Sequence, residues 1–291
     1  MSQNNSTLKI NALSSLLGLT FLFGLNGIAQ AATTFDVMGP HEYDLPAPGF
    51  EPFQVFVQYA YLQDDDKAYD NNGDRVAGSG NTTTVGLSKY VRFWTSESIP
   101  NLGLAYEVIV PEIGVSSEAN GGDVSGFGDP LTGFALWYKP TENSTLGFQS
   151  FLQIPVGDRD VSDTNWKNLS SALWDVRLTD KWGWTGDAGF VFQGSKDDGT
   201  HPGTTFHTNE RLGYRVSKLL EPFVGVDYEY TKGTTTVNKS YILDLSLGVM
   251  FHTFDNQSIA IRYAGSVEGQ VVNGREVYYG LLAKLFLWRM K

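Results

Sequence analysis

Charged residues occur inside segments in which polar and apolar residues alternate. Because successive side chains of a β-strand point to opposite faces, each such segment assigns its charges to one face. The face that we expect to be the inner one carries the charged residues Lys89, Glu107, Asp175, Arg177, Asp187, Arg211, Arg215, Asp227, Glu229, Asp244, Arg262 and Lys284. Such residues could pair with one another, or they could bind a solute or an ion. In either case the face that carries them must contact water or other charged groups and not lipid.

Folding neighbouring strands back about the short connections between them predicts which charges meet. The expected neighbours are Arg177 with Asp187, Arg211 with Asp227, Asp244 near Asp227, and Arg262 within a step of Asp244. Charges left unpaired in a narrow interior are costly, so stability alone predicts that these residues pair. A direct role toward a ligand or an ion is the alternative interpretation.

The same face also carries apolar side chains, which a water-filled pore would have little use for. They are Phe56, Phe151, Val191, Phe223, Ile242, Met250, Leu282 and Phe286. They could pack a narrow interior or contact an apolar solute. From these two sets we select as candidate ligand-binding residues Phe56, Glu107, Phe151, Arg177, Asp187, Arg211, Phe223, Asp227, Asp244, Arg262 and Phe286.

The elements that position these residues are a series of alternating segments after about residue 50. We expect twelve strands, over 53–61, 83–94, 102–112, 131–139, 146–154, 172–178, 184–193, 206–216, 222–230, 240–251, 259–264 and 277–288. Short connections near Asn101, Asn143, Lys181, Leu219 and Asp255 alternate with longer ones. Tight turns at one rim and longer loops at the other are typical of outer-membrane barrels, in which an even strand number places both chain ends on the periplasmic side.

This pattern predicts an all-β fold, a transmembrane antiparallel up-and-down β-barrel of twelve strands. A soluble β-sandwich would also show alternation with frequent turns. The barrel is favoured because the strands are long and because one face of 240–251 is an unbroken apolar series with aromatic residues at both ends. No segment after the N-terminus approaches the roughly 18 consecutive apolar residues of a transmembrane helix.

The N-terminus predicts export. Lys9 precedes an apolar run, and Ala29-Gln30-Ala31 has the small residues of a cleavage site, so we interpret residues 1–31 as a signal peptide. An N-terminal anchor helix is the alternative, but the run is too short for a comfortable span. Residues 32–50 are a Pro-rich leader, and 51–291 form the barrel. The leader either hangs free at the periplasmic rim or folds back into the lumen through Phe35, Val37, Met38 and Leu45.

Composition excludes several classes of partner. The chain has 21 Lys and Arg against 32 Asp and Glu and a formal net charge of −11, which argues against binding of nucleic acid. It has no cysteine, so disulfides and thiolate metal sites are impossible. We expect no cofactor and no metal, since the acidic cluster from Asp70 to Asp74 lacks the terminal Glu of a calcium loop. The expected partners are outer-membrane lipid and a small hydrophobic solute, and the expected state is a monomer in the bacterial outer membrane.

Three stretches resemble the outer-membrane transporter family associated with the meta-pathway of phenol degradation. They are Leu45-Pro46-Ala47-Pro48-Gly49, Asp70-Asn71-Asn72-Gly73-Asp74, and Gly126-Phe127-Gly128-Asp129-Pro130 with the aromatic residues that follow it. They occur in the family's order over the first half of the mature chain. The resemblance implies a porin-like barrel for uptake of small hydrophobic, also aromatic, compounds, and it implies no catalytic residues. A structural or surface-loop barrel that adheres or binds without transporting is the alternative.

An enzyme resembling outer-membrane phospholipase is disfavoured. His207 and Asn209 share a strand, but the outward residue between them is Thr208 and not the Ser that such a nucleophile requires.

Two features do not fit the barrel pattern. Glu210 faces lipid by parity, which suggests a bulge or a later strand start. Three residues also follow Trp288, where outer-membrane barrels end on an aromatic residue.

Overall fold

The computed structural model describes residues 37–117, 122–254 and 257–284. The strands are β1 (Phe53–Tyr69), β2 (Arg75–Ala77), β3 (Asn81–Ser96), β4 (Ile99–Ser117), β5 (Gly122–Phe127), β6 (Leu131–Thr141), β7 (Ser144–Gln153), β8 (Lys167–Arg177), β9 (Trp182–Gln193), β10 (Thr205–Tyr214), β11 (Leu220–Thr231), β12 (Ser240–Phe254), β13 (Gln257–Gln270) and β14 (Val272–Lys284). Within these ranges, no helix is long and apolar enough to cross a membrane.

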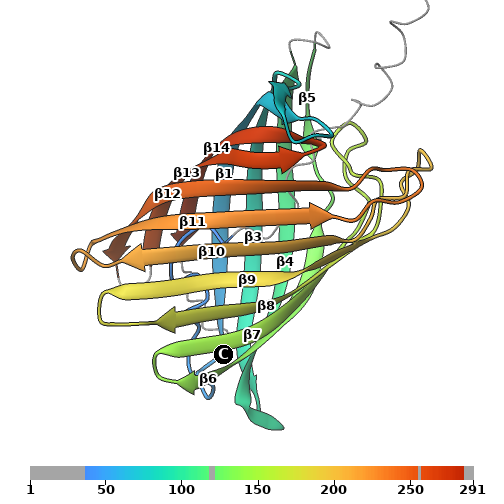
Figure 1. Ribbon diagram of the computed structural model, residues 1–291. Helices are drawn as coiled ribbons and strands as arrows, with labels where there is room; N and C mark the ends of the chain where they lie inside the picture. Colours follow the sequence, from blue (N-terminus) through green and yellow to red (C-terminus); the bar gives the residue numbers. More distant parts are fainter. Residues whose placement is uncertain (1–36, 118–121, 255–256, 285–291) are drawn as a thin grey trace, which may run out of the picture.

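Among the described residues, twelve long strands form one antiparallel sheet in which neighbours in sequence are neighbours in space. β1 pairs with β3 on one side and with β14 on the other, so the first and last strands of the sheet are hydrogen-bonded to each other. β2 and β5 are short additions that pair with β1 and β4. In Figure 1, β6 to β14 slant across one wall while β1, β3 and β4 form the wall behind. The predicted all-β, up-and-down barrel is confirmed.

The connections define two rims. At the short-turn rim, the connections are residues 97–98, 142–143, 178–181 and 215–219. At the opposite, long-loop rim they include 154–166, 194–204 and 232–239. The turn predicted near Asn101 is wrong, because the chain reverses at Glu97–Ser98 and Pro100 lies at the start of β4 next to a register shift. A strand's first residues and its irregularities are the places where proline is tolerated in a sheet.

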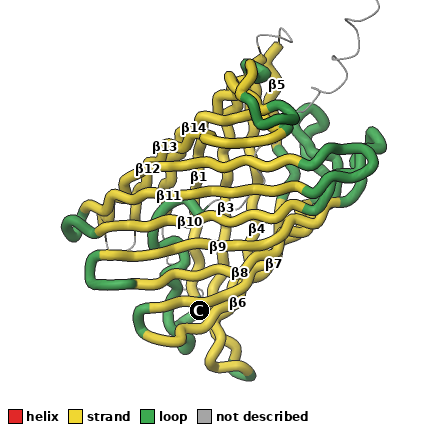
Figure 2. The backbone as a smooth tube through the Cα atoms, in the orientation of Figure 1, coloured by secondary structure: helices red, strands yellow, loops and turns green. Residues whose placement is uncertain are grey.

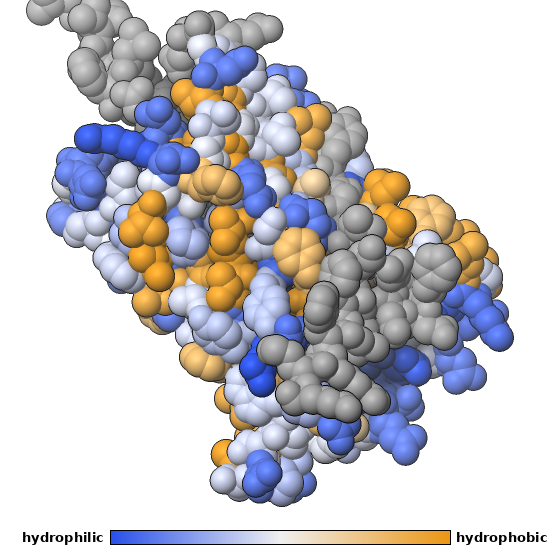
Figure 3. All heavy atoms as spheres, turned by 180° about the vertical axis from the view of Figure 1, so that it is seen from behind, coloured by the Kyte–Doolittle hydropathy of each residue, from blue (hydrophilic) through white to orange (hydrophobic). Residues whose placement is uncertain are grey.

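The two faces of the strands differ as expected. On β9, Thr185 and Asp187 are fully buried while Phe190 and Phe192 are exposed, and on β12 Leu247 is 63 % exposed. Alternation therefore gives an apolar outer wall and a largely polar inner one. Figure 3 views the barrel from the opposite side, where apolar residues lie across the middle and hydrophilic ones gather toward the ends.

Candidate functional site: the lumen and the segment inside it

The leader does not hang free: residues 37–50 contact the inner wall in the half of the barrel next to the short-turn rim. Met38, 2 % exposed, packs in one cluster with Val57, Met250 and Ala260 from three different strands. Arg262 donates from Nη1 to the carbonyl oxygen of Val37 at 3.3 Å. Figure 2 shows the segment as a loop running between the walls. The predicted contact of Met38 with the lumen is confirmed, whereas Phe35 lies outside the described residues.

His41 is the best-anchored residue of the leader. Its backbone nitrogen donates to Thr185 Oγ1 at 2.9 Å, its Nε2 lies 3.0 Å from Glu221 Oε1, and its Nδ1 lies 3.5 Å from Asp175 Oδ1. Its φ of 63° is a left-handed conformation, which is uncommon for residues other than glycine, although histidine adopts it more often than most. Burial by itself would lower the pKa of His41, but the hydrogen bonds and charges of Asp175 and Glu221 outweigh it and raise the pKa to about 9.

Two glycines of the inner wall leave room for Pro40 and His41 of the leader. A Cβ placed on Gly183 of β9 would approach the His41 ring to 2.5 Å, and one on Gly213 of β10 would approach Pro40 to 2.9 Å. Larger residues at these two positions would therefore collide with the leader. The fit indicates that the leader and the wall form one packed unit.

Nearer the rim, charged and aromatic contacts hold the leader. Asp44 lies 2.9 Å from Lys139 Nζ and 3.3 Å from Arg177 Nη2. Trp137, fully buried, donates from Nε1 to the carbonyl oxygen of Pro46 at 2.9 Å and stacks on Phe50. These contacts connect the leader to β6 and β8.

The expectation for Phe56 is wrong: its side chain is 39 % exposed, whereas Val57 next to it is buried. The odd-numbered residues of β1 face inward, as Tyr59 shows by donating its hydroxyl to Glu42 of the leader at 2.6 Å. Apolarity alone assigns the more apolar face of β1 to the lipid. That face packs against the leader instead, which supplies an apolar neighbour inside the barrel.

The band of charges forms, with a changed arrangement. Arg211 lies 2.7 Å from Asp227, so this predicted contact is confirmed. Asp244 lies opposite Asp227 as expected and accepts a hydrogen bond from Ser266. Arg262, predicted beside Asp244, instead lies opposite Gly248 and reaches Asp227 at 3.2 Å. Asp227 is thus held between two arginines.

The expected pair of Arg177 and Asp187 does not form. The turn at 178–181 sets Arg177 opposite Gly183, and Asp187 opposite Leu173, four residues further along. Asp187 instead accepts a hydrogen bond from Asn209 Nδ2 at 2.8 Å.

Glu107 pairs with Lys89 at 2.6 Å on the inner side of β3 and β4. Phe223 is inward and 4 % exposed. Phe286 lies outside the described residues, and the side chains of Leu282 and Lys284 are not described.

An apolar stripe crosses the inner wall in the other half of the barrel, near the long-loop rim. It consists of Ile109, Leu131, Phe151, Leu169 and Val191, each at most 6 % exposed. Cross-strand pairing joins Ile109 to Leu131, Phe151 to Leu169, and Leu169 to Val191. The five residues form one packing cluster over β4, β6, β7, β8 and β9, closer to the long-loop rim than the charged band and the leader.

The loop 154–166 is fixed beside this stripe by one carboxylate. Asp129 accepts hydrogen bonds from the backbone nitrogens of Gly157 and Asp163 and from the hydroxyl of Ser162, at 2.7 to 3.0 Å. Asp129 is 5 % exposed and belongs to the Gly-Phe-Gly-Asp-Pro motif noted in the sequence. The motif thus organises the mouth at the long-loop rim, a role that the sequence alone did not reveal.

Glu210 needs neither a bulge nor a later strand start. β10 begins at Thr205 and pairs without a register shift to both neighbours, so Glu210 does face outward. Trp184 Nε1 donates to its carboxylate at 2.7 Å, and Thr208 Oγ1 donates at 3.1 Å. The indole and the hydroxyl compensate part of the cost of a carboxylate on the outer wall.

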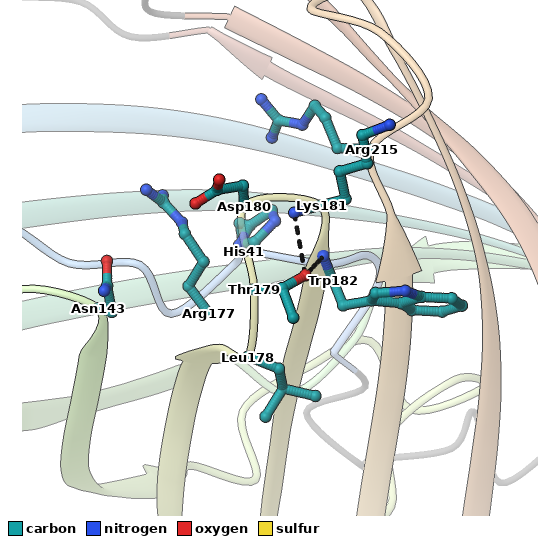
Figure 4. A pocket seen from close by; sticks show the side chains of 9 residues that line it. All are labelled: His41, Asn143, Arg177, Leu178, Thr179, Asp180, Lys181, Trp182 and Arg215. Carbon is teal, nitrogen blue, oxygen red and sulfur yellow. Dashed lines mark hydrogen bonds between the residues drawn. The ribbon is translucent and has the colours of Figure 1, made fainter.

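A polar cavity of about 490 Å³ opens at the short-turn rim. It is lined by His41, Asn143, Arg177, Leu178, Thr179, Asp180, Lys181, Trp182 and Arg215 (Figure 4). The sequence predicted Arg177 and Arg215 as inward residues but not this cavity, because its walls come from the leader and from separate strand ends.

The fold and the lumen place the protein in the class of outer-membrane β-barrels. The family model described as "Putative MetA-pathway of phenol degradation" matches residues 65–280, so the chain belongs to this family. An outer membrane channel from Pseudomonas putida F1 is similar in structure, with a TM-score of 0.70, 18% identity, and coverage of 84% of this chain and 99% of that one.

Two further structures are more distant. The β-domain of the Bordetella autotransporter BrkA has a TM-score of 0.51 and 12% identity, over 81% of this chain and 100% of that one. A structure described as the CymD monoaromatic hydrocarbon channel has a TM-score of 0.51 and 10% identity, over 82% and 90%. At these identities the likenesses show the fold. A search of curated proteins returned no match.

Proposed function

We propose that this protein is a channel that admits small hydrophobic compounds, including aromatic ones, across the outer membrane. The apolar stripe of Ile109, Leu131, Phe151, Leu169 and Val191 carries the proposal. These side chains are at most 6 % exposed, so a solute reaches them only when neighbouring side chains move aside, and the surface it then meets is apolar, whereas a pore for sugars or ions is lined by polar groups. The family membership and the likeness to solved channels support transport rather than catalysis.

Solute would enter at the long-loop rim, pass the stripe and the charged band, and then meet the leader. Because residues 37–50 pack against the inner wall in the half of the barrel next to the short-turn rim, passage of a solute requires the leader to shift. Deleting residues 33–46 should therefore raise single-channel conductance in a planar bilayer. Unchanged conductance in a properly folded deletion variant would show that the lumen's own side chains set its bore.

Liposomes containing the protein test the substrate class. After uptake by protein-free liposomes is subtracted, uptake of benzyl alcohol should exceed uptake of a monosaccharide of similar size. Phe151→Asn should reduce uptake of the aromatic compound, while Phe151→Leu, which keeps the stripe apolar, should retain it. Equal uptake of both solutes, or none by the wild type and the leader deletion, would favour a barrel that does not transport and acts through its surface loops.

We also propose that one chain suffices. The pairing of β1 with β14 completes the sheet within a single chain, so no strand of a second copy is needed. The mass of the detergent-solubilised protein, measured by light scattering with the detergent subtracted, should correspond to one chain.

A further inference from the structure

The cavity at the short-turn rim has a charge opposite to that of the chain. The whole chain has a net charge of −11. Yet the cavity is lined by three permanent cations, Arg177, Lys181 and Arg215, against the single carboxylate of Asp180. Local excess of one sign in a concave site attracts ligands of the other sign, because the field is concentrated there.

The cations come from places that the barrel brings together. Arg177 ends β8, Lys181 lies in the turn that follows, and Arg215 follows the end of β10. In Figure 4 their side chains rise on the same side of the turn. Lys181 is exposed, and its ammonium lies 5.8 Å from the centroid of the Tyr214 ring, which positions the chain without neutralising it.

Arg177 and Arg215 each form an ion pair with an acidic residue of the protein, but neither pair uses the full binding capacity of the guanidinium. The pair of Arg177 and Asp44 is exposed, with side chains 48 % and 36 % accessible, and such pairs are weak. Arg215 contacts Glu221 through Nε at 2.8 Å, so this contact does not use its two terminal nitrogens. A guanidinium can bind a carboxylate through two parallel hydrogen bonds, which a single Nε contact does not provide.

We propose that this cavity is a binding site for a small organic carboxylate that approaches from the periplasmic side. The inference rests on the proposed function in that the ligand is the anionic relative of a solute of the channel. The cavity volume of about 490 Å³ lies within the roughly 300–1,000 Å³ of small-molecule sites. The carboxylate is bound by Lys181, Arg215 and Arg177, and the remainder of the ligand lies toward Asn143 and the turn.

Ligand binding at this site is coupled to the leader. Asp44 of the leader holds Arg177, so a bound carboxylate competes with it. Coupling between two binding events is reciprocal, so loosening Asp44 must strengthen ligand binding. Loss of the Asp44 carboxylate should therefore raise the affinity for the ligand, whereas damage to the fold would lower it.

Calorimetric titration of the full-length protein in detergent tests the site without a membrane. Benzoate should bind, and benzyl alcohol, which has the same ring without the charge, should not. Lys181→Gln should weaken benzoate binding about five- to tenfold, and Lys181→Arg should restore it. Lys218→Gln removes the same charge from an exposed position of the 215–219 turn, outside the cavity lining, and should change the affinity less than about twofold.

Asp44→Asn should increase benzoate affinity, and raising the salt from 50 to 500 mM should reduce it, because screening lengths shorten to a few ångströms, on the order of 4 Å. Equal binding of benzyl alcohol, no effect of Lys181→Gln, or a weaker site in Asp44→Asn would overturn the proposal. Tighter binding of inorganic phosphate with the same dependence on Lys181 would reassign the site to phosphate. Because these titrations need no transport, failed liposome uptake with intact benzoate binding would refute only the channel function.

Discussion

Docking of the leader should depend on pH through His41. Once released, the imidazole has its ordinary pKa of 6.5, whereas in its place between Asp175 and Glu221 the pKa is about 9. A raised pKa means that protonation stabilises the docked state. This stabilisation is fully present below pH 6.5 and is lost as the pH rises through about 9. At ~1.4 kcal/mol per pH unit, the difference between 6.5 and about 9 corresponds to about 3.5 kcal/mol, which is between two and three orders of magnitude in the docking equilibrium.

The chain has no cysteine, so a single introduced thiol reports on docking. Met38→Cys places the thiol where the side chain is 2 % exposed, and Ala47→Cys places one at an exposed leader position. The ratio of maleimide labelling at the two sites cancels the dependence of the reagent on thiolate. We expect this ratio to be low at pH 6 to 7 and to rise through pH 9.

His41→Gln in the Met38→Cys background should give a high ratio at every pH. His252 also contacts Glu221, at 2.9 Å, but it belongs to β12 and not to the leader, so His252→Gln should keep the rise. A ratio that is the same at pH 7 and pH 10, or a rise that persists in His41→Gln, would refute the assignment of His41 as the titrating anchor.

The remaining predictions concern the barrel wall. Arg211→Ala should lower the free energy of unfolding by about 1–4 kcal/mol, with Arg262 remaining as a partner of Asp227, and the double variant with Asp227→Asn should lose less than the sum of the two single losses, because both substitutions remove the same contact; additive effects in denaturant titrations would contradict the contact. Asp129→Ala should make the loop 154–166 more sensitive to limited proteolysis, with no loss of the barrel's heat-modifiable migration on gels. The wild-type protein should fractionate with the outer membrane, and recovery as a soluble periplasmic protein would contradict the fold. Trp184→Phe should destabilise the barrel less in the Glu210→Gln background, because no carboxylate is then left without the indole donor.

The sequence alone determined the class of fold. Period-two alternation fixes which residues share a face, and a barrel in a membrane requires an apolar outer face along every strand, so the strand series could be recognised without any long-range information. The contact of Arg211 with Asp227 followed as well, because β10 and β11 are neighbours joined by a short connection and pair without a register shift.

Tertiary structure alone decided what fills the lumen and which face of β1 is the inner one. Phe56 and Val57 are both apolar, so parity by itself could not distinguish them; the leader packed against Val57 through Met38 makes the choice. The pairing register of β8 with β9 could not be predicted either, because alternation along the strands does not tell how many residues the 178–181 turn contains. The rim cavity, finally, joins the leader to the ends of β8, β9 and β10, and contacts between segments so distant in sequence exist only once the barrel has closed.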